Sequence, residues 1–241
     1  MIVDHFRWFL NSICMYSNSL FNKRVLITAG PTREALDKMG YAIAEGFLQQ
    51  GAEVVLVSGP VSISLQHPNL TLVKVNAARE MYLACCHYFE SVDIAIFTAA
   101  VADYRPEKAE KKKIRKDKKA FTIKMVKNVD IAFEFGKIKA ADQLAIGYAL
   151  ETNDEKGHTR EKLKKKNFDM VILNSMNDTH ATLGYDTNKI SLLRSDGICK
   201  DIPLKAKTEM AVDIVLEVAD ILSDKIGQSI LTGSDLYDYS Y

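Results

Sequence analysis

Short apolar runs alternate with amphipathic segments along most of the chain. The apolar runs are rich in Val, Ile and Leu and lie at 24–29, 53–57, 70–75, 92–98, 143–149 and 169–174. Continuous runs of this kind are typical of strands buried on both faces of a parallel sheet. We expect helices where apolar residues recur three and four positions apart, near 38–50, 78–89, 128–140 and 154–166. The alternation predicts an α/β fold with a doubly wound, mostly parallel sheet of Rossmann-like type.

Two segments depart from this rhythm. Residues 99–125 are too long for an ordinary connection, and their basic centre and strand-like end, FTIKMV, predict a functional flap. Residues 188–204, NKISLLRSDGICKDIPL, place a Ser-Asp-Gly turn between two alternating runs, which predicts a late β-hairpin. A last helix is expected at 206–225.

The expected organisation is one domain with short additions at both ends. We place an N-terminal extension at 1–22, the domain at 23–225 and a loose C-terminal tail at 226–241, with no internal repeat. A chain of 241 residues with 47% hydrophobic and 26% charged residues is long enough to bury a sizeable core.

Charge and cysteine content narrow the function classes. The formal net charge of +1 gives no overall field for nucleic acid or anionic lipid, so we expect neither partner. Polar residues interrupt the apolar N-terminus before a signal peptide or membrane span forms, which predicts a cytoplasmic protein. The four cysteines lack metal-ligand spacing, and we interpret them as reduced thiols; they are Cys14, Cys85, Cys86 and Cys199.

Small and polar residues follow several of the predicted strands. They occupy 30–33, 58–60, 98–103, 147–152 and 174–175. Any one of these segments alone is best explained as turn chemistry. In an open parallel sheet, however, ligands bind beyond the carboxyl ends of the strands, so five such ends in one crevice predict a nucleotide or phosphate site.

The flap carries the most chemical information. Ala99 and Ala100 let a ligand approach the backbone closely, and Asp103 is a candidate partner for a metal or hydroxyl group. Residues 106–119 hold eight Lys or Arg against three Asp or Glu. Such a run is usually a solvated face, but above the strand ends it can clamp a triphosphate. A nucleic-acid patch is the rival interpretation, and it lacks interleaved aromatic residues.

Three further residues have both a functional and a structural explanation. Lys162 and Lys166 are four apart and share one face of a helix, so both can reach one anion; a solubilising surface with Glu161 as partner is equally consistent. Asp130 begins a helix after Asn128, where it is either a simple N-cap or part of a helix end that holds a ligand's polar edge.

Taken in order, these motifs resemble phosphopantothenoylcysteine synthetase from about Lys23 to about Leu222. The resemblance is carried by VLITAGPTRE, KMGYAIAEG, AAVADYRPEK, IKMVKNVDI, GYALET, REKLKKKNFDMVILN, GYDTNKI and IPLKAKTEMA. It implies a ligase of coenzyme A biosynthesis that joins 4'-phosphopantothenate to L-cysteine through an acyl-nucleotidyl intermediate. It further implies CTP or ATP as co-substrate, Mg²⁺ or Mn²⁺, and a homodimer. Because 1–22 is too short for the flavin-dependent decarboxylase fused to many members, it implies a stand-alone form.

The resemblance also assigns roles to individual residues, while the metal ligands stay unknown. It makes Lys113 the catalytic flap lysine, and it makes Ala99 and Ala100 substrate-binding. The nucleotide-binding set that it implies is Gly30, Asp103, Lys113, Val129, Asp130, Ile131, Ala132, Tyr148, Lys162 and Lys166. Val129 replaces a proline of the family, and Tyr148 stands where many members have phenylalanine.

One departure keeps alternatives open. Between Asp37 and Lys38 the family carries an arginine, a substrate-holding asparagine and a Ser-Ser-Gly turn that this sequence lacks. Either the chain has lost this loop, or a flexible segment is missing from the sequence as it stands. A catalytically weakened nucleotide-binding homologue is therefore the second interpretation. An NAD(P)-dependent oxidoreductase is the third, and the glycines after the first strand lack GxGxxG spacing.

Overall fold

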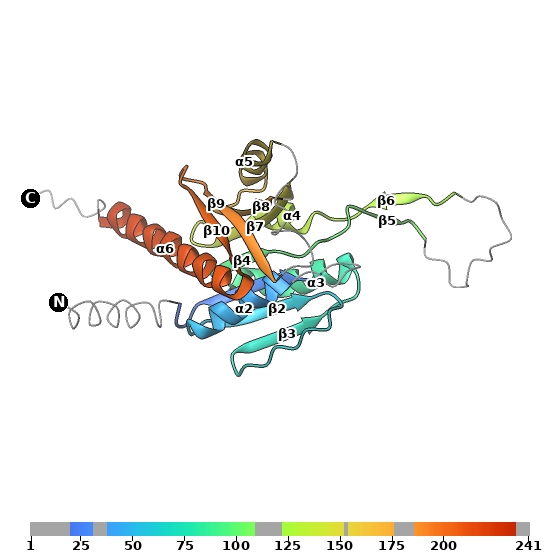
Figure 1. Ribbon diagram of the computed structural model, residues 1–241, viewed down its shortest axis with the longest axis horizontal. Coiled ribbons are helices and arrows are strands. Elements are labelled where there is room, and N and C mark those ends of the chain that lie inside the picture. Colours follow the sequence, from blue (N-terminus) through green and yellow to red (C-terminus); the bar gives the residue numbers. More distant parts are fainter. Residues whose placement is uncertain (1–19, 31–37, 109–121, 152–153, 176–185, 235–241) are drawn as a thin grey trace, which may run out of the picture.

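A computed structural model of the chain describes residues 20–30, 38–108, 122–151, 154–175 and 186–234 (Figure 1). Its strands are β1 (Arg24–Ala29), β2 (Glu53–Ser58), β3 (Leu70–Lys74), β4 (Ile94–Phe97), β5 (Tyr104–Pro106), β6 (Met125–Lys127), β7 (Leu144–Glu151), β8 (Met170–Ser175), β9 (Thr187–Arg194) and β10 (Cys199–Ala206). Its helices are α2 (Lys38–Gln49), α3 (Ala78–Tyr88), the 3-10 turn η1 (Phe89–Ser91), α4 (Ile131–Ile138), α5 (Glu155–Lys165) and α6 (Lys207–Ser234).

Eight strands form one sheet in the order β10-β9-β8-β7-β4-β1-β2-β3. The pairs from β3 to β8 are parallel, whereas β9 runs antiparallel to both β8 and β10. The order reverses between β1 and β4, which is where ligands bind in doubly wound sheets. The predicted mostly parallel sheet and late hairpin are thus confirmed.

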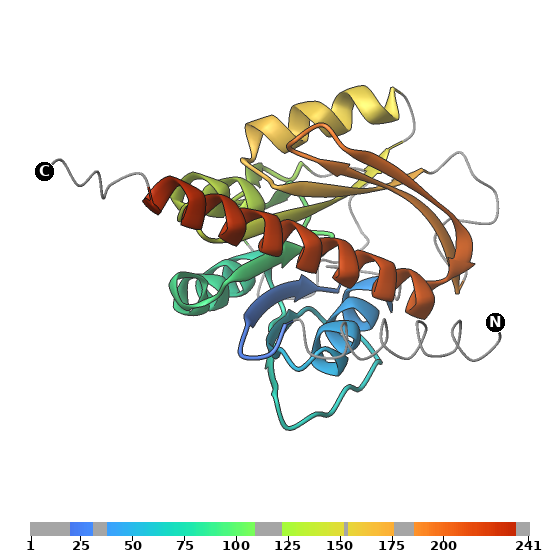
Figure 2. The same cartoon turned by 90° about the vertical axis from the view of Figure 1, so that its left-hand side faces the viewer.

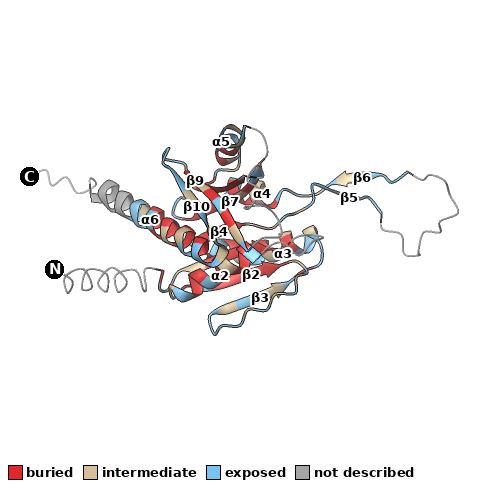
Figure 3. Cartoon of the chain, viewed as in Figure 1, coloured by how far each residue is buried: buried red, intermediate tan, exposed pale blue. Residues whose placement is uncertain are grey.

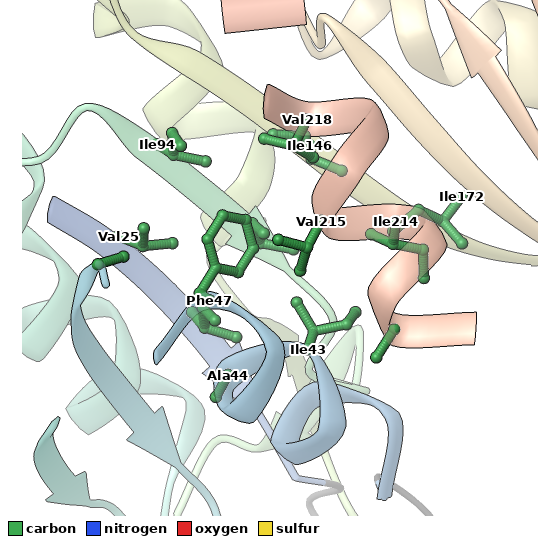
Figure 4. Close-up of a cluster of buried hydrophobic side chains, with 14 of the residues drawn as sticks. Val25, Ile43, Ala44, Phe47, Ile94, Ile146, Ile172, Ile214, Val215 and Val218 are labelled. Atoms are coloured by element: carbon green, nitrogen blue, oxygen red, sulfur yellow. The ribbon is translucent and has the colours of Figure 1, made fainter. Parts of the chain in front are cut away.

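Helices cover both faces of this sheet. On one face α2 and α6 bury a cluster that includes Ile43, Phe47 and Val215 against the strand residues Val25 and Ile146 (Figure 4). On the other face α3, α4 and α5 pack over a second buried cluster. Figure 2 shows α6 lying across its face of the sheet, and Figure 3 shows buried residues concentrated where the helices meet the strands. Because alternate strand residues enter opposite clusters, the strands are apolar throughout, as the sequence pattern predicted.

The predicted flap begins and ends as a two-stranded arm. Strands β5 and β6 pair antiparallel outside the main sheet and extend away from the body of the molecule (Figure 1). The strand-like end of the flap is therefore confirmed, though only for Met125–Lys127. The basic centre of the flap at 109–121 lies outside the described residues.

Two boundaries differ from expectation. Helix α6 continues to Ser234, past residue 225 where we expected the helix to end and a loose tail to follow. Gly227 weakens a helix by about 1 kcal/mol but does not stop it, and no proline follows. Leu20, which we assigned to the N-terminal extension, is fully buried in the cluster beneath α2 and α6. The packed body therefore begins before Lys23.

Carboxylates fix the amino ends of the parallel strands. Asp169, before β8, accepts hydrogen bonds from Lys139 Nζ (2.7 Å) and from the backbone N–H of Ala145 at the start of β7 (2.7 Å). Lys225 Nζ of α6 adds a third contact at 3.2 Å. Asp93, before β4, accepts a hydrogen bond from the backbone N–H of Arg24 (2.8 Å). These contacts align neighbouring strands at one edge of the sheet.

In the described part of the chain, no helix has the length and apolar character that crossing a membrane requires.

Candidate nucleotide-binding site

A cavity of about 370 Å³ lies at the carboxyl ends of β4 and β7, on the face covered by α4 and α5. The backbone around it is held by the side chain of Thr98, whose Oγ1 donates to the carbonyl of Thr28 in β1 at 2.7 Å. The aromatic rings of Phe97 and Phe168 pack beneath it with centroids 6.1 Å apart. The cavity therefore sits next to the reversal of strand order, where the topology predicts a ligand.

Most of the site residues expected from sequence meet in this cavity. Its walls include Ala99, Asp103, Val129, Asp130, Ile131, Ala132, Tyr148, Lys162 and Lys166. Ala100 is exposed at the adjacent turn and does not line the cavity. Lys113 lies outside the described residues, as does the junction at Asp37. The structure thus brings nine of the expected residues together from four separate stretches of chain.

Gly30 is placed differently from our expectation. It follows β1 with a φ of +87°, and an added Cβ would lie 3.0 Å from the backbone nitrogen of Gly59 after β2. Its glycine character is therefore explained by the close approach of two strand ends. Neither Gly30 nor Gly59 lines the cavity. Of the described residues in the five polar strand ends, only those within 98–103 and 147–149 line this cavity, and residues 31–33 lie outside the described part of the chain.

The N-terminus of α4 forms one wall. Asp130 is its N-cap, and Oδ1 accepts a hydrogen bond from the backbone N–H of Phe133 at 3.1 Å. The N-cap expectation is thereby confirmed. The same Oδ1 lies 2.9 Å from Nζ of Lys166, so one carboxylate both caps α4 and pairs with the end of α5. Helix α4 presents the positive end of its dipole toward the cavity.

The opposite wall is the basic face of α5. Lys162, Lys165 and Lys166 are three and four positions apart and all line the cavity. Lys162 forms a short ion pair with Glu151 at the end of β7, whose side chain is 13% exposed. Glu161 is therefore not the partner of these lysines among the described contacts: Glu151 and Asp130 are.

A glycine brings α4 and α5 this close. An added Cβ at Gly136 of α4 would lie 1.9 Å from the carbonyl oxygen of Lys166, well inside van der Waals contact. Asn167 Nδ2 also donates to the carbonyl of Gly136 at 2.9 Å. The end of α5, with its lysines, is thus held directly against α4.

The main chain of Tyr148 lines the cavity, but its aromatic ring lies on the other face of the sheet. Along β7, Ala145 and Ala149 enter the cluster beneath α4 and α5, whereas the side chain of Tyr148 packs against the cluster on the α2 and α6 face. Its hydroxyl accepts a hydrogen bond from Nδ2 of the buried Asn188 in β9 at 3.1 Å. Strand alternation therefore gives the cavity the main chain of Tyr148. This arrangement does not place the Tyr148 ring beneath a nucleotide bound in the cavity.

Sequence reasoning did not single out two lysines of the site, Lys127 at the end of β6 and Lys165, although both line the cavity. Gly147 lies in the predicted strand end at 147–152 and also lines the cavity, and its added Cβ would lie 2.3 Å from the Phe168 ring. Glycine inside a strand is itself a signal of close approach, and Gly147 was open to that interpretation. The two lysines gave no such signal, because they sit among other lysines whose direction depends on the fold.

The arrangement suits an anion with an attached polar ring. Four lysines and a helix N-terminus supply positive charge and N–H donors, while the small side chain of Ala99 covers little of the backbone. The Asp103 carboxylate forms no ion pair with any described residue, so it can supply an oxygen ligand to a divalent cation shared with phosphate groups. Within the described residues, no group of three His, Cys, Asp or Glu side chains is arranged to hold a metal ion.

Comparisons with known proteins identify the family of the chain. A family model described as the DNA/pantothenate metabolism flavoprotein C-terminal domain matches residues 20–222. The chain is 37% identical over 223 residues to the coenzyme A biosynthesis bifunctional protein CoaBC of Bacillus subtilis, covering 88% of this chain and 54% of that protein. It is 38% identical over 214 residues to a cysteine/cysteine sulfinic acid decarboxylase of an unknown prokaryotic organism, covering 84% of this chain and 60% of that protein. The chain thus spans little more than half the length of these relatives.

Solved structures give the same result for the fold. The C-terminal domain of a CoaBC protein superposes with a TM-score of 0.72 at 37% identity, covering 86% of this chain and all of that one. A Cab2 mutant in complex with phosphopantothenate-cysteine superposes with a TM-score of 0.63 at 15% identity, covering 95% of this chain and 94% of that one, which shows a shared fold. The chain therefore belongs to the family of DNA/pantothenate metabolism flavoprotein C-terminal domains, as its motifs indicated.

Proposed function

We propose that this chain is a ligase that joins 4'-phosphopantothenate to L-cysteine, using a nucleoside triphosphate. The observation that carries the proposal is the cavity at the carboxyl ends of β4 and β7, where small residues and lysines surround a helix N-terminus. A relative that matches over 223 residues is named for coenzyme A biosynthesis, and a protein of the same fold was solved with phosphopantothenate-cysteine.

The chemistry explains why a triphosphate is needed. A carboxylate is a poor electrophile until its oxygen becomes part of a good leaving group. In the proposed first step, a carboxylate oxygen of phosphopantothenate attacks the α-phosphorus of CTP or ATP and pyrophosphate leaves. In the second step, the amine of cysteine attacks the acyl carbon, the nucleoside monophosphate leaves with the bonding electron pair, and the amine loses a proton.

The cavity residues divide these tasks in the proposal. The N-terminus of α4, from Val129 to Ala132, binds the polar edge of the base through its backbone, and Lys162 and Lys166 contact the nucleotide from α5. The turn at Ala99 and Ala100 faces the substrate carboxylate. A bound Mg²⁺ or Mn²⁺ would neutralise phosphate charge, with Asp103 as its protein ligand.

The flap supplies the remaining catalytic group in this proposal. Lys113 is the flap lysine, and it stabilises charge that develops on the transferring phosphorus. We expect Lys113→Ala to lower turnover by about a hundredfold or more while the unfolding midpoint stays unchanged. Turnover equal to that of the wild type would remove Lys113 from the mechanism.

We also propose that the chain acts as a homodimer. The arm formed by β5 and β6 stands outside the body with Tyr104, Ile123 and Met125 about half exposed, at 59%, 50% and 48%. Exposed apolar side chains on a projecting element favour a protein contact. Light scattering at micromolar concentration tests this, and a monomer mass would contradict it.

A ligation assay tests the function. Purified protein is incubated with Mg²⁺, 4'-phosphopantothenate, cysteine and either CTP or ATP, and both pyrophosphate and the ligated product are measured. We expect both products with at least one nucleotide, and pyrophosphate without cysteine in at most one equivalent per site. Triphosphate binding without either product would favour the weakened homologue. Binding of NAD(P) without triphosphate binding would favour the oxidoreductase.

A further inference from the structure

The four lysines that line the cavity fall into two classes. Lys162 and Lys166 each have a carboxylate partner, Glu151 and Asp130 respectively. Lys127 and Lys165 line the same cavity and form no ion pair or side-chain hydrogen bond with any residue that the structure describes. Both are exposed, whereas the paired lysines are half-buried.

Lys127 has a firmly placed backbone. It is the last residue of β6 and lies opposite Tyr104 of β5 in the arm. The next residue, Asn128, donates its backbone N–H to the carbonyl of Asp103 at 2.8 Å and its Nδ2 to the carbonyl of Ala102 at 2.7 Å. Lys127 is therefore held at the base of the arm, beside the turn that carries Asp103.

Lys165 is held equally well from the other side. It is the last residue of α5, and the following residue, Lys166, is in contact with Gly136 of α4 through its carbonyl oxygen. Lys165 shares a helix face with Lys162, three positions earlier. The two unpaired ammonium groups thus enter the cavity from different elements, one from the arm and one from α5.

Pairing changes what each class of lysine can do. A lysine and a carboxylate at hydrogen-bond distance together carry no net charge, so the pair attracts a distant anion only weakly. An anion that binds must also compete with that carboxylate for the ammonium group. An unpaired lysine offers its full charge and all three donors to a phosphate oxygen. Among the lysines that the structure describes in this cavity, Lys127 and Lys165 therefore supply the net attraction for a polyanion.

We propose that Lys127 and Lys165 form the polyphosphate-binding pair of this cavity, with the ion-paired Lys162 and Lys166 serving as a fixed wall for the nucleoside end. The proposal rests on the proposed use of a nucleoside triphosphate. It assigns the phosphate chain to the space between the base of the arm and the end of α5. A divalent cation at Asp103 would lie beside the same phosphates.

Calorimetry on single and double variants tests the assignment. The variants are Lys127→Met, Lys165→Met and both together, with Lys164→Met as the matched control, because Lys164 is on α5 but does not line the cavity. The probes are Mg²⁺ with CTP or ATP, the corresponding monophosphate, and inorganic tripolyphosphate. We expect each single variant to weaken triphosphate and tripolyphosphate binding about tenfold, and the double variant about a hundredfold. Monophosphate affinity and the Lys164→Met control should stay within about twofold of the wild type.

The outcomes separate this inference from the proposed function. Lys127→Met and Lys165→Met variants that bind both polyphosphates as tightly as Lys164→Met overturn the inference alone. A wild-type protein that binds tripolyphosphate with the expected variant effects, yet forms no ligated product, supports the inference and contradicts the ligase. A wild-type protein that binds neither polyphosphate overturns both. Unfolding midpoints within 2 °C of the wild type show that the variants fold.

Discussion

The amino and carboxyl ends of the parallel strands use their charges in opposite ways. At the amino ends, Asp169 has three partners and is only 13% exposed, and Lys139 beside it is 8% exposed. At the carboxyl ends, Lys127, Lys165 and Asp103 line a cavity and form no ion pair with any described residue. Both sets lie at opposite ends of the same sheet and are built from the same residue types, lysine and aspartate.

The contrast separates structural charges from functional ones. Removing a buried carboxylate that has several donors is strongly destabilising, because its partners are left buried without a counter-charge. Cations and a carboxylate without counter-charges contribute little to folding and leave their interactions for a ligand. The comparison therefore predicts that substitutions at the amino ends change unfolding, and that substitutions at the carboxyl ends change binding.

The largest effect is expected at Asp169. Asp169→Ala leaves Lys139 buried without a counter-charge and frees the N–H of Ala145, so the free energy of unfolding should fall by about 3–5 kcal/mol. Denaturant unfolding measures this. Asp103→Ala is the control at the opposite end and should stay within about 0.5 kcal/mol of the wild type. Equal losses in the two variants would remove the distinction between the two ends.

A substitution between α4 and α5 should change both quantities. The Cβ of Gly136→Ala meets the carbonyl of Lys166 in the present backbone, so the helices must separate, at a cost of about 2 kcal/mol. The same movement displaces the end of α5 and its lysines, which should weaken tripolyphosphate binding. Unfolding and calorimetry on one preparation check both effects. Lost stability with unaltered binding would show that α5 does not form the anion site.

A smaller effect is expected where a paired lysine loses its counter-charge. In Glu151→Gln the side chain keeps its shape and can still accept a hydrogen bond from Lys162, but the negative charge is gone. Tripolyphosphate should then bind about threefold more tightly, since Lys162 is no longer neutralised. Competition calorimetry resolves a change of this size. Weaker binding would mean that Glu151 orients Lys162 and that its charge does not compete with the ligand.

The smallest effect concerns thiol reactivity, with no change in stability or binding. Burial raises the pKa of the Cys85 thiol to about 12, and the neighbouring Cys86 thiol adds to the shift. A raised pKa lowers the thiolate fraction at pH 8, so iodoacetamide should leave Cys85 unmodified in the folded protein. The exposed Cys86 is the internal control and should be modified. Mass spectrometry of the peptide that contains both cysteines measures the alkylated fraction of Cys85 relative to that of Cys86. Equal labelling of the two thiols would contradict the prediction and would show that α3 opens.

Local patterns predicted the elements well. Apolar runs located the strands of the main parallel sheet, three- and four-residue spacing located its helices, and Asp130 was correctly considered as an N-cap. These features depend on neighbours within one or two turns of chain, which a sequence displays directly. The end of α6 was wrong because a glycine lowers helix stability without ending a helix.

The site was harder to predict because it depends on distant contacts. Lys166 pairs with Asp130, 36 positions earlier, so the spacing on α5, which offered Glu161 as one of two alternatives, could not reveal this partner. The direction of the Tyr148 ring follows from strand alternation together with the hydroxyl contact to Asn188, 40 positions away. Lys127 lines the site because β6 returns the chain to the turn that carries Asp103. Such choices are made by tertiary packing and leave little trace in local spacing.

The most direct measurement is a crystal structure of the protein with Mg²⁺ and a non-hydrolysable CTP or ATP analogue. The account predicts a nucleotide in the cavity between α4 and α5, with its phosphate chain within hydrogen-bond distance of Nζ of Lys127 and of Lys165. A nucleotide bound instead at the strand ends of Gly30 and Gly59, or phosphates that contact neither lysine, would contradict it.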